Sequence, residues 1–252
     1  MHYWQHSCMF RCKLDIMRRI FTFLLLVISL SSCEVLNQLP AGTSGIAGIT
    51  EAEAAEGIKE ALGQGLAKAV LQLNTTDGFF KDAFYKILLP PDAQKIENTL
   101  RSIGLGSQVD KAILQINRGA EDAAGYAKPI FVDAIKNMTL QDAIGLVKNG
   151  DTSATHFFRM KTTEKLLAAF RPVIQSSLDK VSATKYYGDM VNTYNNFPTT
   201  IKKINPDLTS FVTAKATDAL FDLVAKEEKN IRDNIAARTS EILRKVFGSK
   251  LQ

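Results

Sequence analysis

The sequence has few of the residues on which thiol and metal chemistry depend. From Cys33 onward there is one cysteine, Cys33 itself, no tryptophan, and a single histidine, His156. One cysteine cannot form an internal disulfide, and these residues supply too few thiolate and imidazole ligands for a zinc site. A Ser-His-Asp triad would have to use His156, and no Gly-x-Ser-x-Gly motif accompanies it. We therefore expect no metal and no cofactor, and we interpret His156 as an ordinary histidine.

A strong charge of one sign is also missing. Residues 1–32 contain four of the 31 Lys and Arg residues and one of the 26 Asp and Glu residues. The remainder therefore holds 27 basic and 25 acidic residues, a net charge of +2. Recognition of nucleic acid by charge needs a larger and clustered basic excess. We expect no nucleic-acid partner.

The apolar run near the N-terminus is too short to cross a membrane. It covers the eleven residues 20–30, whereas a spanning helix needs about 20. Two arginines, Arg18 and Arg19, precede the run, and two serines follow it, which is the pattern of a signal peptide. Leu30 and Cys33 add the spacing of a lipobox, the cleavage motif of bacterial lipoproteins.

These features predict a bacterial lipoprotein with residues 1–32 as its signal peptide. Cys33 then becomes the lipid-modified first residue, and the protein is anchored to a membrane of the cell envelope, facing the periplasm. The alternative is an ordinary secretory signal with a chance cysteine at position 33. Residues 1–16 contain a His and Cys cluster that suggests a metal site, but we favour an over-extended gene start with translation beginning at Met17.

The rest of the sequence divides into a tether and a helical domain. Residues 33–49 are rich in turn-forming residues and lack periodic apolar positions, so we expect a tether there. Residues 50–252 show no alternating strand pattern and are predicted to form one all-α domain.

Within this domain, helices are expected where apolar residues recur every three to four positions. We expect Gly57, Gly63 and Gly65 to permit close helix contact or bending of the first helix. A short aromatic helical turn is expected at 77–84. The helix that begins at 107 is expected to break at Pro129, and Asp151 is expected to cap a helix that is separate from the one carrying 166–172 and beyond. The other predicted helices are 50–73, 91–104, 139–150, 207–224 and beyond, and 236–248.

Many short motifs spread along this domain resemble those of one family. The run from Ile116 to Ala123 is the longest, and the resemblance covers roughly residues 55–248. The family is DUF4197, bacterial envelope proteins of unknown function, so the resemblance implies location and fold but no activity. Gly119 stands where the family has Ala, which we expect to loosen a helix, and Ile235 stands where it has Pro, which we expect to make the last two helices more nearly continuous. Further matching motifs are Pro129-Ile130-Phe131, Ala134-Ile135, Met138-Thr139, Asp142-Ala143, Gly150-Asp151, Ala154-Thr155, Phe158, Asp207-Leu208, Val212-Thr213, Leu220-Phe221, Glu227-Glu228, Ile231-Arg232, Ala237-Arg238 and Val246-Phe247.

Charged residues at helical spacing form the candidate polar cluster. If they converge in a cleft, they could perform acid–base chemistry, bind a divalent cation or hold an anionic head group. If they instead form interhelical ion pairs, they fix helix register, and we favour this second interpretation. Asp218 and Asp222 also share a helix face. The cluster consists of Asn117, Arg118, Glu121, Glu227, Glu228, Arg232 and Arg238.

Three functions remain open at this point. The first is a non-catalytic interaction or structural role in the envelope, with the membrane and an envelope protein as partners. The second is the binding of a small apolar ligand or lipid between helices. The third is a carboxylate-based or cation-dependent hydrolase, which requires Glu121, Glu227 or Glu228 within reach of one another in an open cleft.

Overall fold

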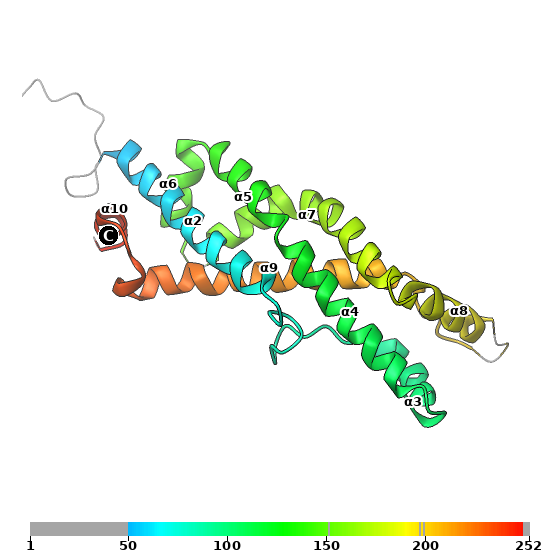
Figure 1. Cartoon of the computed structure of the whole chain (residues 1–252). Coiled ribbons are helices and arrows are strands. Elements are labelled where there is room, and N and C mark those ends of the chain that lie inside the picture. Colours follow the sequence, from blue (N-terminus) through cyan, green and yellow to red (C-terminus); the bar gives the residue numbers. More distant parts are fainter. Residues whose placement is uncertain (1–49, 151, 197, 199, 249–252) are drawn as a thin grey trace, which may run out of the picture. The chain divides into compact units, whose positions relative to one another are not determined.

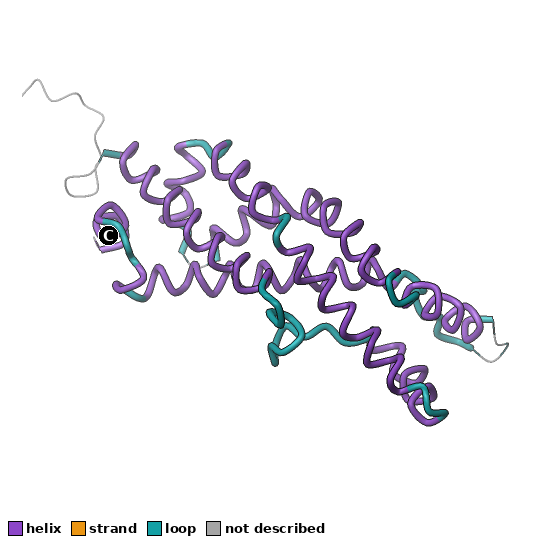
Figure 2. Tube along the Cα trace, viewed as in Figure 1, coloured by secondary structure: helices purple, strands orange, loops and turns teal. Residues whose placement is uncertain are grey.

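The computed structural model describes residues 50–150, 152–196, 198 and 200–248. The predicted signal peptide, the tether with Cys33, and the predicted cap Asp151 lie outside these residues. In the part of the chain that is described, helices and loops occur and no strand does (Figure 2), which confirms the all-α fold class. No helix in this part is both long enough and apolar enough to cross a bilayer.

Four long helices, α2, α4, α7 and α9, carry most of the packing (Figure 1). Helix α4 packs against α7, α7 against α9, and α2 against α9. The shorter helices extend this core: α5, α6 and α10 pack on α2, α3 packs on α4, and α8 packs on α7. The helices are α2 (Glu51–Asn74), α3 (Gln94–Ser102), α4 (Gly106–Ala124), α5 (Ala127–Lys136), α6 (Leu140–Lys148), α7 (Ser153–Asp179), α8 (Ala183–Asn195), α9 (Leu208–Asp233) and α10 (Glu241–Gly248), with 3₁₀ turns at Pro91–Ala93 and Ile235–Ala237.

The start of α2 follows from its local sequence. The Glu53 N–H donates to Thr50 Oγ1 at 3.2 Å, and the Thr50 N–H donates to Glu53 Oε2 at 2.8 Å. This reciprocal capping box satisfies two of the N–H groups that every helix start leaves unpaired. The predicted apolar face, including Ile58, Leu66 and Leu73, is buried. Thr139 and Asp142 form the same capping box at the start of α6.

Aromatic rings join three helices at the centre of the core. Phe131 of α5 contacts Phe158 of α7 with the ring centroids 5.7 Å apart, and Phe221 of α9 at 6.2 Å. Both pairs are edge-to-face, an arrangement that adds about 0.5–1.5 kcal/mol per pair beyond the area that it buries. All three rings are fully buried, so they fix the positions of the helices that carry the polar residues described below.

Glycines permit close helix contacts at two crossings. A Cβ at Gly119 would lie 2.9 Å from Ser177 Cβ and 3.3 Å from Ile174 Cα, and one at Gly57 would lie 2.9 Å from Ile242 Cγ1. Gly119 therefore lets α4 approach α7 more closely than an alanine would allow, and the expectation that it loosens its helix stays a prediction. Gly63 has no neighbour within 4 Å of such a Cβ, so close contact does not explain it.

Three predicted segments differ in the structure. Residues 77–84 form turns instead of a helical turn, because Glu121 takes up the N–H groups of Phe79 and Phe80. Helix α4 ends at Ala124, before the predicted break at Pro129, which lies in the first turn of α5, where its missing N–H costs nothing. The two helices expected between 151 and 179 form the single helix α7, in which Pro172 is accommodated.

The C-terminal part differs as well. The last two helices are not more nearly continuous, despite Ile235, because α9 ends at Asp233 and α10 begins at Glu241, not near 236. The Asn234 side chain accepts from the Ala236 N–H, which holds the intervening turn. Helix α8 is absent from the sequence-based prediction, although Tyr187 and Val191 are buried on one of its faces.

The two helical glycines Gly119 and Gly63 provide a matched test of the close contact. We expect Gly63→Ala to raise the free energy of unfolding by about 0.5–1 kcal/mol, since alanine favours the helix. We expect Gly119→Ala to lower it by about 1–3 kcal/mol, because the added methyl group overpacks the α4–α7 crossing. Urea unfolding followed by circular dichroism measures both. Equal stabilisation by the two substitutions would contradict the close contact.

Candidate functional site

The first polar group lies where α4 meets the loop between α2 and α3, and we call Asp77, Asn117, Arg118 and Glu121 the α4 cluster. Glu121 is 3% exposed. Its Oε1 accepts from the N–H groups of Phe79 and Phe80, both at 3.1 Å, and its Oε2 lies 2.6 Å from Arg118 Nη1. Each carboxylate oxygen is therefore occupied, and Glu121 holds the turn that follows α2.

Arg118 and Asn117 also bind this loop. Arg118 Nη2 lies 2.7 Å from Asp77 Oδ1, and Asp77 adopts a left-handed φ of 69°. Hydrogen bonds from Lys81 and then from Arg118 lower the pKa of Asp77. The fully buried Asn117 pairs with both backbone groups of Ile87, accepting from its N–H and donating to its carbonyl, each at 2.8 Å. The α4 cluster thus determines the path of residues 77–87.

The second polar group lies where α9 meets the start of α7, and we call Thr155, Glu228 and Arg232 the α9 cluster. Glu228 Oε1 accepts from the Ala154 N–H at 3.0 Å, and its Oε2 accepts from the Thr155 N–H at 2.9 Å and from Thr155 Oγ1 at 2.8 Å. These are the second and third N–H groups of α7, which an N-cap side chain normally satisfies. The residue at the cap position, Thr152, has a left-handed φ of 66° and makes no side-chain cap. Glu228 therefore caps the N-terminus of α7, although it lies 73 residues after Thr155 in the sequence.

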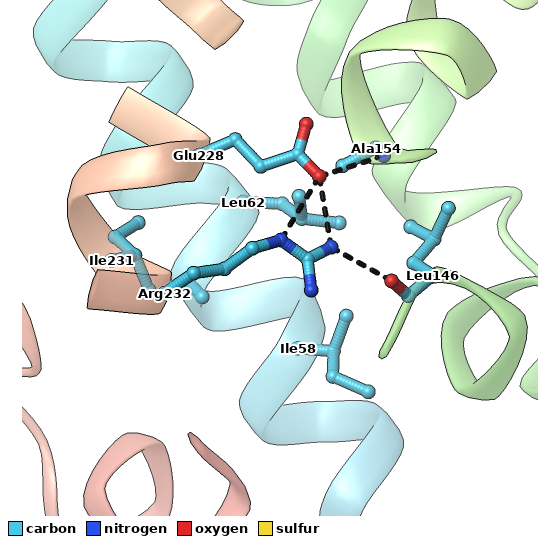
Figure 3. Close-up of a pocket in the computed structure, with 8 residues that line it drawn as sticks. Ile58, Leu62, Leu146, Ala154, Glu228, Ile231 and Arg232 are labelled. Atoms are coloured by element: carbon cyan, nitrogen blue, oxygen red, sulfur yellow. Dashed lines mark hydrogen bonds and ion pairs between the residues drawn. The ribbon is translucent and has the colours of Figure 1, made fainter. Parts of the chain in front are cut away.

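Arg232 connects this cap to α6. Its Nη2 donates to Glu228 Oε1 at 2.8 Å, to the Leu146 carbonyl at 2.8 Å and to Ser153 Oγ at 3.0 Å. Figure 3 shows the Arg232 guanidinium next to the Glu228 carboxylate, with Leu62 and Ile58 of α2 beside them. The cavity that they line measures about 30 Å³, which leaves room for a water molecule and not for an organic substrate.

The remaining predicted residues are engaged elsewhere. Glu227, although adjacent to Glu228, pairs with Lys68 of α2, its Oε1 2.7 Å from Lys68 Nζ. Arg238 donates from Nε to the Ile231 carbonyl at 3.1 Å and from Nη2 to the Arg232 carbonyl at 2.7 Å. These carbonyls lie in the last turn of α9, so Arg238 caps that helix at its C-terminus.

The single cleft considered from the sequence does not form. Among the described residues, Glu121 and Glu228 share no hydrogen-bond partner, and the acceptor oxygens of both are taken by protein donors. Every buried side-chain nitrogen and oxygen in the described segments has a partner. The arrangement stabilises two junctions of the backbone. The pairs Arg118–Glu121 and Glu228–Arg232 each lie within one helix, and of the predicted acids only Glu227 forms an interhelical ion pair, with Lys68.

A third polar group was not predicted from the sequence and consists of Tyr85, Asp222 and Lys226. Tyr85 donates to Asp222 Oδ2 at 2.6 Å, Lys226 Nζ donates to Tyr85 Oη at 2.6 Å, and Lys226 lies 2.9 Å from Asp222. The hydrogen bond from Tyr85, followed by that from Lys226, lowers the pKa of Asp222. Burial, followed by the hydrogen bond to Asp222, raises the pKa of Tyr85. The i, i+4 spacing of Asp222 and Lys226 is visible in the sequence, but no signal indicates Tyr85, 137 residues away.

The other chemistry-bearing residues are separate from these groups. Asp218 does not join Asp222 in a site but pairs with Arg159 at 3.0 Å. His156 is exposed. Over the segments that the structure describes, no three or more His, Cys, Asp and Glu residues are placed to hold a metal ion.

Comparison with known proteins gives one match. Residues 48–248 match the sequence model of the family described as "Protein of unknown function (DUF4197)". The chain belongs to the DUF4197 family. Neither the comparison with curated proteins nor that with solved structures finds a match. The matched range contains all of the polar groups described above, so they are features of this DUF4197 domain and not of an added segment.

The adjacent residues Glu228 and Glu227 allow the cap on α7 to be tested in this DUF4197 domain. We expect Glu228→Ala to lower the free energy of unfolding by about 3–5 kcal/mol, because it leaves two helix N–H groups and the Arg232 guanidinium without their acceptor. We expect Glu227→Ala to cost less than about 1 kcal/mol, since its partner Lys68 is largely solvent-exposed. Urea unfolding measures both, and equal losses would refute the capping role.

Glu121 offers a second test of the same interpretation. We expect Glu121→Ala to cost about 3 kcal/mol of unfolding free energy, because the buried N–H of Phe79 and the Arg118 guanidinium lose their acceptor. Asp110→Ala is the control: Asp110 pairs with Arg101 in solvent, and we expect a change within about 0.5 kcal/mol. Thermal and urea unfolding provide the measurement. A fully stable Glu121→Ala protein would indicate that Glu121 serves another purpose.

Proposed function

We propose that this DUF4197 protein is a lipid-anchored, non-catalytic interaction protein of the bacterial cell envelope. The observation that supports a non-catalytic role is the engagement of the two buried carboxylates. Glu121 and Glu228 use their oxygens to hold backbone N–H groups and arginines. Both oxygens of each carboxylate are thus bound to protein donors.

The hydrolase alternative depended on an open cleft shared by these carboxylates. Glu121, Glu227 and Glu228 contact different partners, and the cavity beside Glu228 measures about 30 Å³, so this geometry does not favour a hydrolase. The proposed partners are the membrane, through the lipid on Cys33, and an envelope protein that contacts the helical domain.

The proposed anchor rests on the sequence, with Leu30 three positions before Cys33 and an apolar run behind two arginines. A tether of about sixteen residues would keep the domain within some 20–25 Å of the bilayer, taking about 5–6 Å times the square root of the residue number. Phe84, 86% exposed, and Met160, 65% exposed, are large apolar side chains at the domain surface and are therefore accessible to a protein partner.

A second candidate function, the binding of a small apolar ligand or lipid, is favoured by one specific observation. A groove of about 540 Å³ lies between α3 and α8 and is lined mainly by apolar atoms. This volume falls within the range of about 300–1,000 Å³ that is typical of ligand sites.

The anchor makes the first proposal directly testable. Cells that express the full chain and grow on an alkyne-bearing fatty acid should incorporate the label into the wild-type protein. Cys33→Ser should abolish labelling, because it removes the only acceptor thiol of the mature chain. Cys12→Ser, which lies upstream of the predicted cleavage point, should leave labelling unchanged, and persistent labelling of Cys33→Ser would refute the anchor.

The same cells can test the interaction role. A photo-crosslinking amino acid at Phe84 or Met160 should trap an envelope protein upon irradiation, with unirradiated cells as the control. Failure to trap any protein from either position, with the labelled anchor intact, would count against the interaction role while leaving the anchor in place.

A further inference from the structure

The groove between α3 and α8 is lined mainly by apolar atoms and is open to solvent in the part of the chain that the structure describes. Its α3 wall carries Ile96 and Leu100, and its α8 wall carries Met190 and Tyr194. In each pair the two residues are four apart, so they project from one face of their helix. The two faces are opposed across a volume of about 540 Å³ that opens to solvent.

Helix α3 is unusual in that none of its residues is buried. Helices as short as nine residues gain most of their stability from packing an apolar face, yet α3 packs on α4 while its apolar residues Ile96 and Leu100 stay partly exposed to the groove. Ile96 also contacts the hydrophobic core, and an occupant of the groove would cover the parts of Ile96 and Leu100 that remain exposed.

The walls are held in place without an occupant. Arg101 ties α3 to α4, with Nη2 2.9 Å from Asp110 Oδ1. On the other side, Tyr187 and Val191 bury the inner face of α8. An ion pair between Lys202 and Asp92, at 2.5 Å, joins the segment after α8 to the turn before α3. Because α3 packs on α4 and α8 packs on α7, both walls belong to the folded domain, as in most small-ligand sites.

The uncompensated charge at the groove is positive. Two charged residues line it, Lys95 and Asp189. Asp189 is neutralised by Lys185, 2.7 Å away. Lys95 is exposed, and its side-chain ammonium has no hydrogen-bond or ion-pair partner among the described residues. The neighbouring acids are also engaged, Asp92 with Lys202 and Glu97 with Arg101. The free charge at this apolar groove is thus one cation, which complements an anion.

The length of the walls distinguishes between kinds of occupant. The lining residues run from Lys95 to Leu100 on α3 and from Asp189 to Tyr194 on α8, about 7.5 Å on each helix at 1.5 Å per residue. A bound amphipathic helix uses anchors at i, i+3, i+4 and i+7, a span of about 10.5 Å. The lined length is too short for anchors at these fixed positions, whereas a flexible apolar chain with one charged end needs no fixed anchor spacing and can extend past the walls.

We propose that the groove binds a single-chain amphiphile with an anionic head group, the chain lying against Ile96, Leu100 and Met190 and the head group on Lys95. This proposal rests on the second candidate function and specifies its site and ligand class. Tyr194 closes the α8 wall.

Calorimetric titration of the full chain with decanoate, kept below its aggregation concentration, tests the proposal. We expect saturable binding with one site per chain. Lys95→Glu should weaken decanoate binding by about tenfold, because it places a negative charge beside the carboxylate. Lys111→Glu, the same change at an exposed lysine on α4 outside the groove, should alter the dissociation constant by less than about twofold.

A second ligand and a second variant separate the two parts of the site. Binding of 1-decanol, which has the chain without the charge, should be insensitive to Lys95→Glu. Met190→Gln should weaken both ligands by about tenfold, because it removes apolar contact with the chain. The melting temperature of each variant, measured by circular dichroism, ensures that a loss of binding is not a loss of fold.

Three results would overturn the proposal, and they have different meanings. Absence of decanoate uptake by the wild-type chain would remove the ligand-binding function itself. Uptake that Lys95→Glu and Met190→Gln leave unchanged would retain that function but place it outside the groove. Equal weakening by Lys95→Glu and Lys111→Glu would reduce the effect to net charge. None of these results affects the Cys33 anchor, which the labelling experiment tests independently.

Discussion

The cap that Glu228 places on α7 is the interaction on which the rest of the structure depends. Helix α7 packs against α4, α5, α8 and α9, so the position of its first turn determines the arrangement of the core. That turn begins at a residue with a left-handed φ and without its own capping side chain. The charge of Glu228 lies at the positive end of the α7 dipole and is balanced by Arg232. One carboxylate therefore connects the start of α7 to α9 and, through Arg232, to α6.

In the α4 cluster, side chains of a helix likewise accept hydrogen bonds from backbone N–H groups, here those of a loop. Residues 77–87 include no regular element, and their buried N–H groups need acceptors because an unpaired buried donor costs about 1–3 kcal/mol. Glu121 and Asn117 provide these acceptors from the side of α4. Both polar clusters thus replace local capping by a side chain from another helix, which explains why charged residues at helical spacing lie at buried positions in a domain without a shared cleft.

Whether an interaction could be predicted depended on how far apart its two partners lie in the sequence. The capping boxes at Thr50 and Thr139 span three residues, so the sequence displays both partners, and the starts of α2 and α6 were predictable. Glu121 acts on residues 41–42 positions away and Glu228 on residues 73–74 positions away. Helical spacing identified both as important, but it carried no information on their partners, so a common cleft and an ion-pair network were both compatible with the sequence.

The distance between Glu228 and Thr155 also bears on the order in which the domain can fold. A chain that ends before α9 has the residues of α7 but leaves the first N–H groups of that helix without an acceptor. The loop closed by the contact is long, and contacts between residues distant in sequence form late because the entropy of closure comes first. A chain without residues 208–233 therefore lacks both the carboxylate that caps α7 and the helix against which α7 packs. The first turn of α7 thus depends on a segment near the far end of the domain sequence.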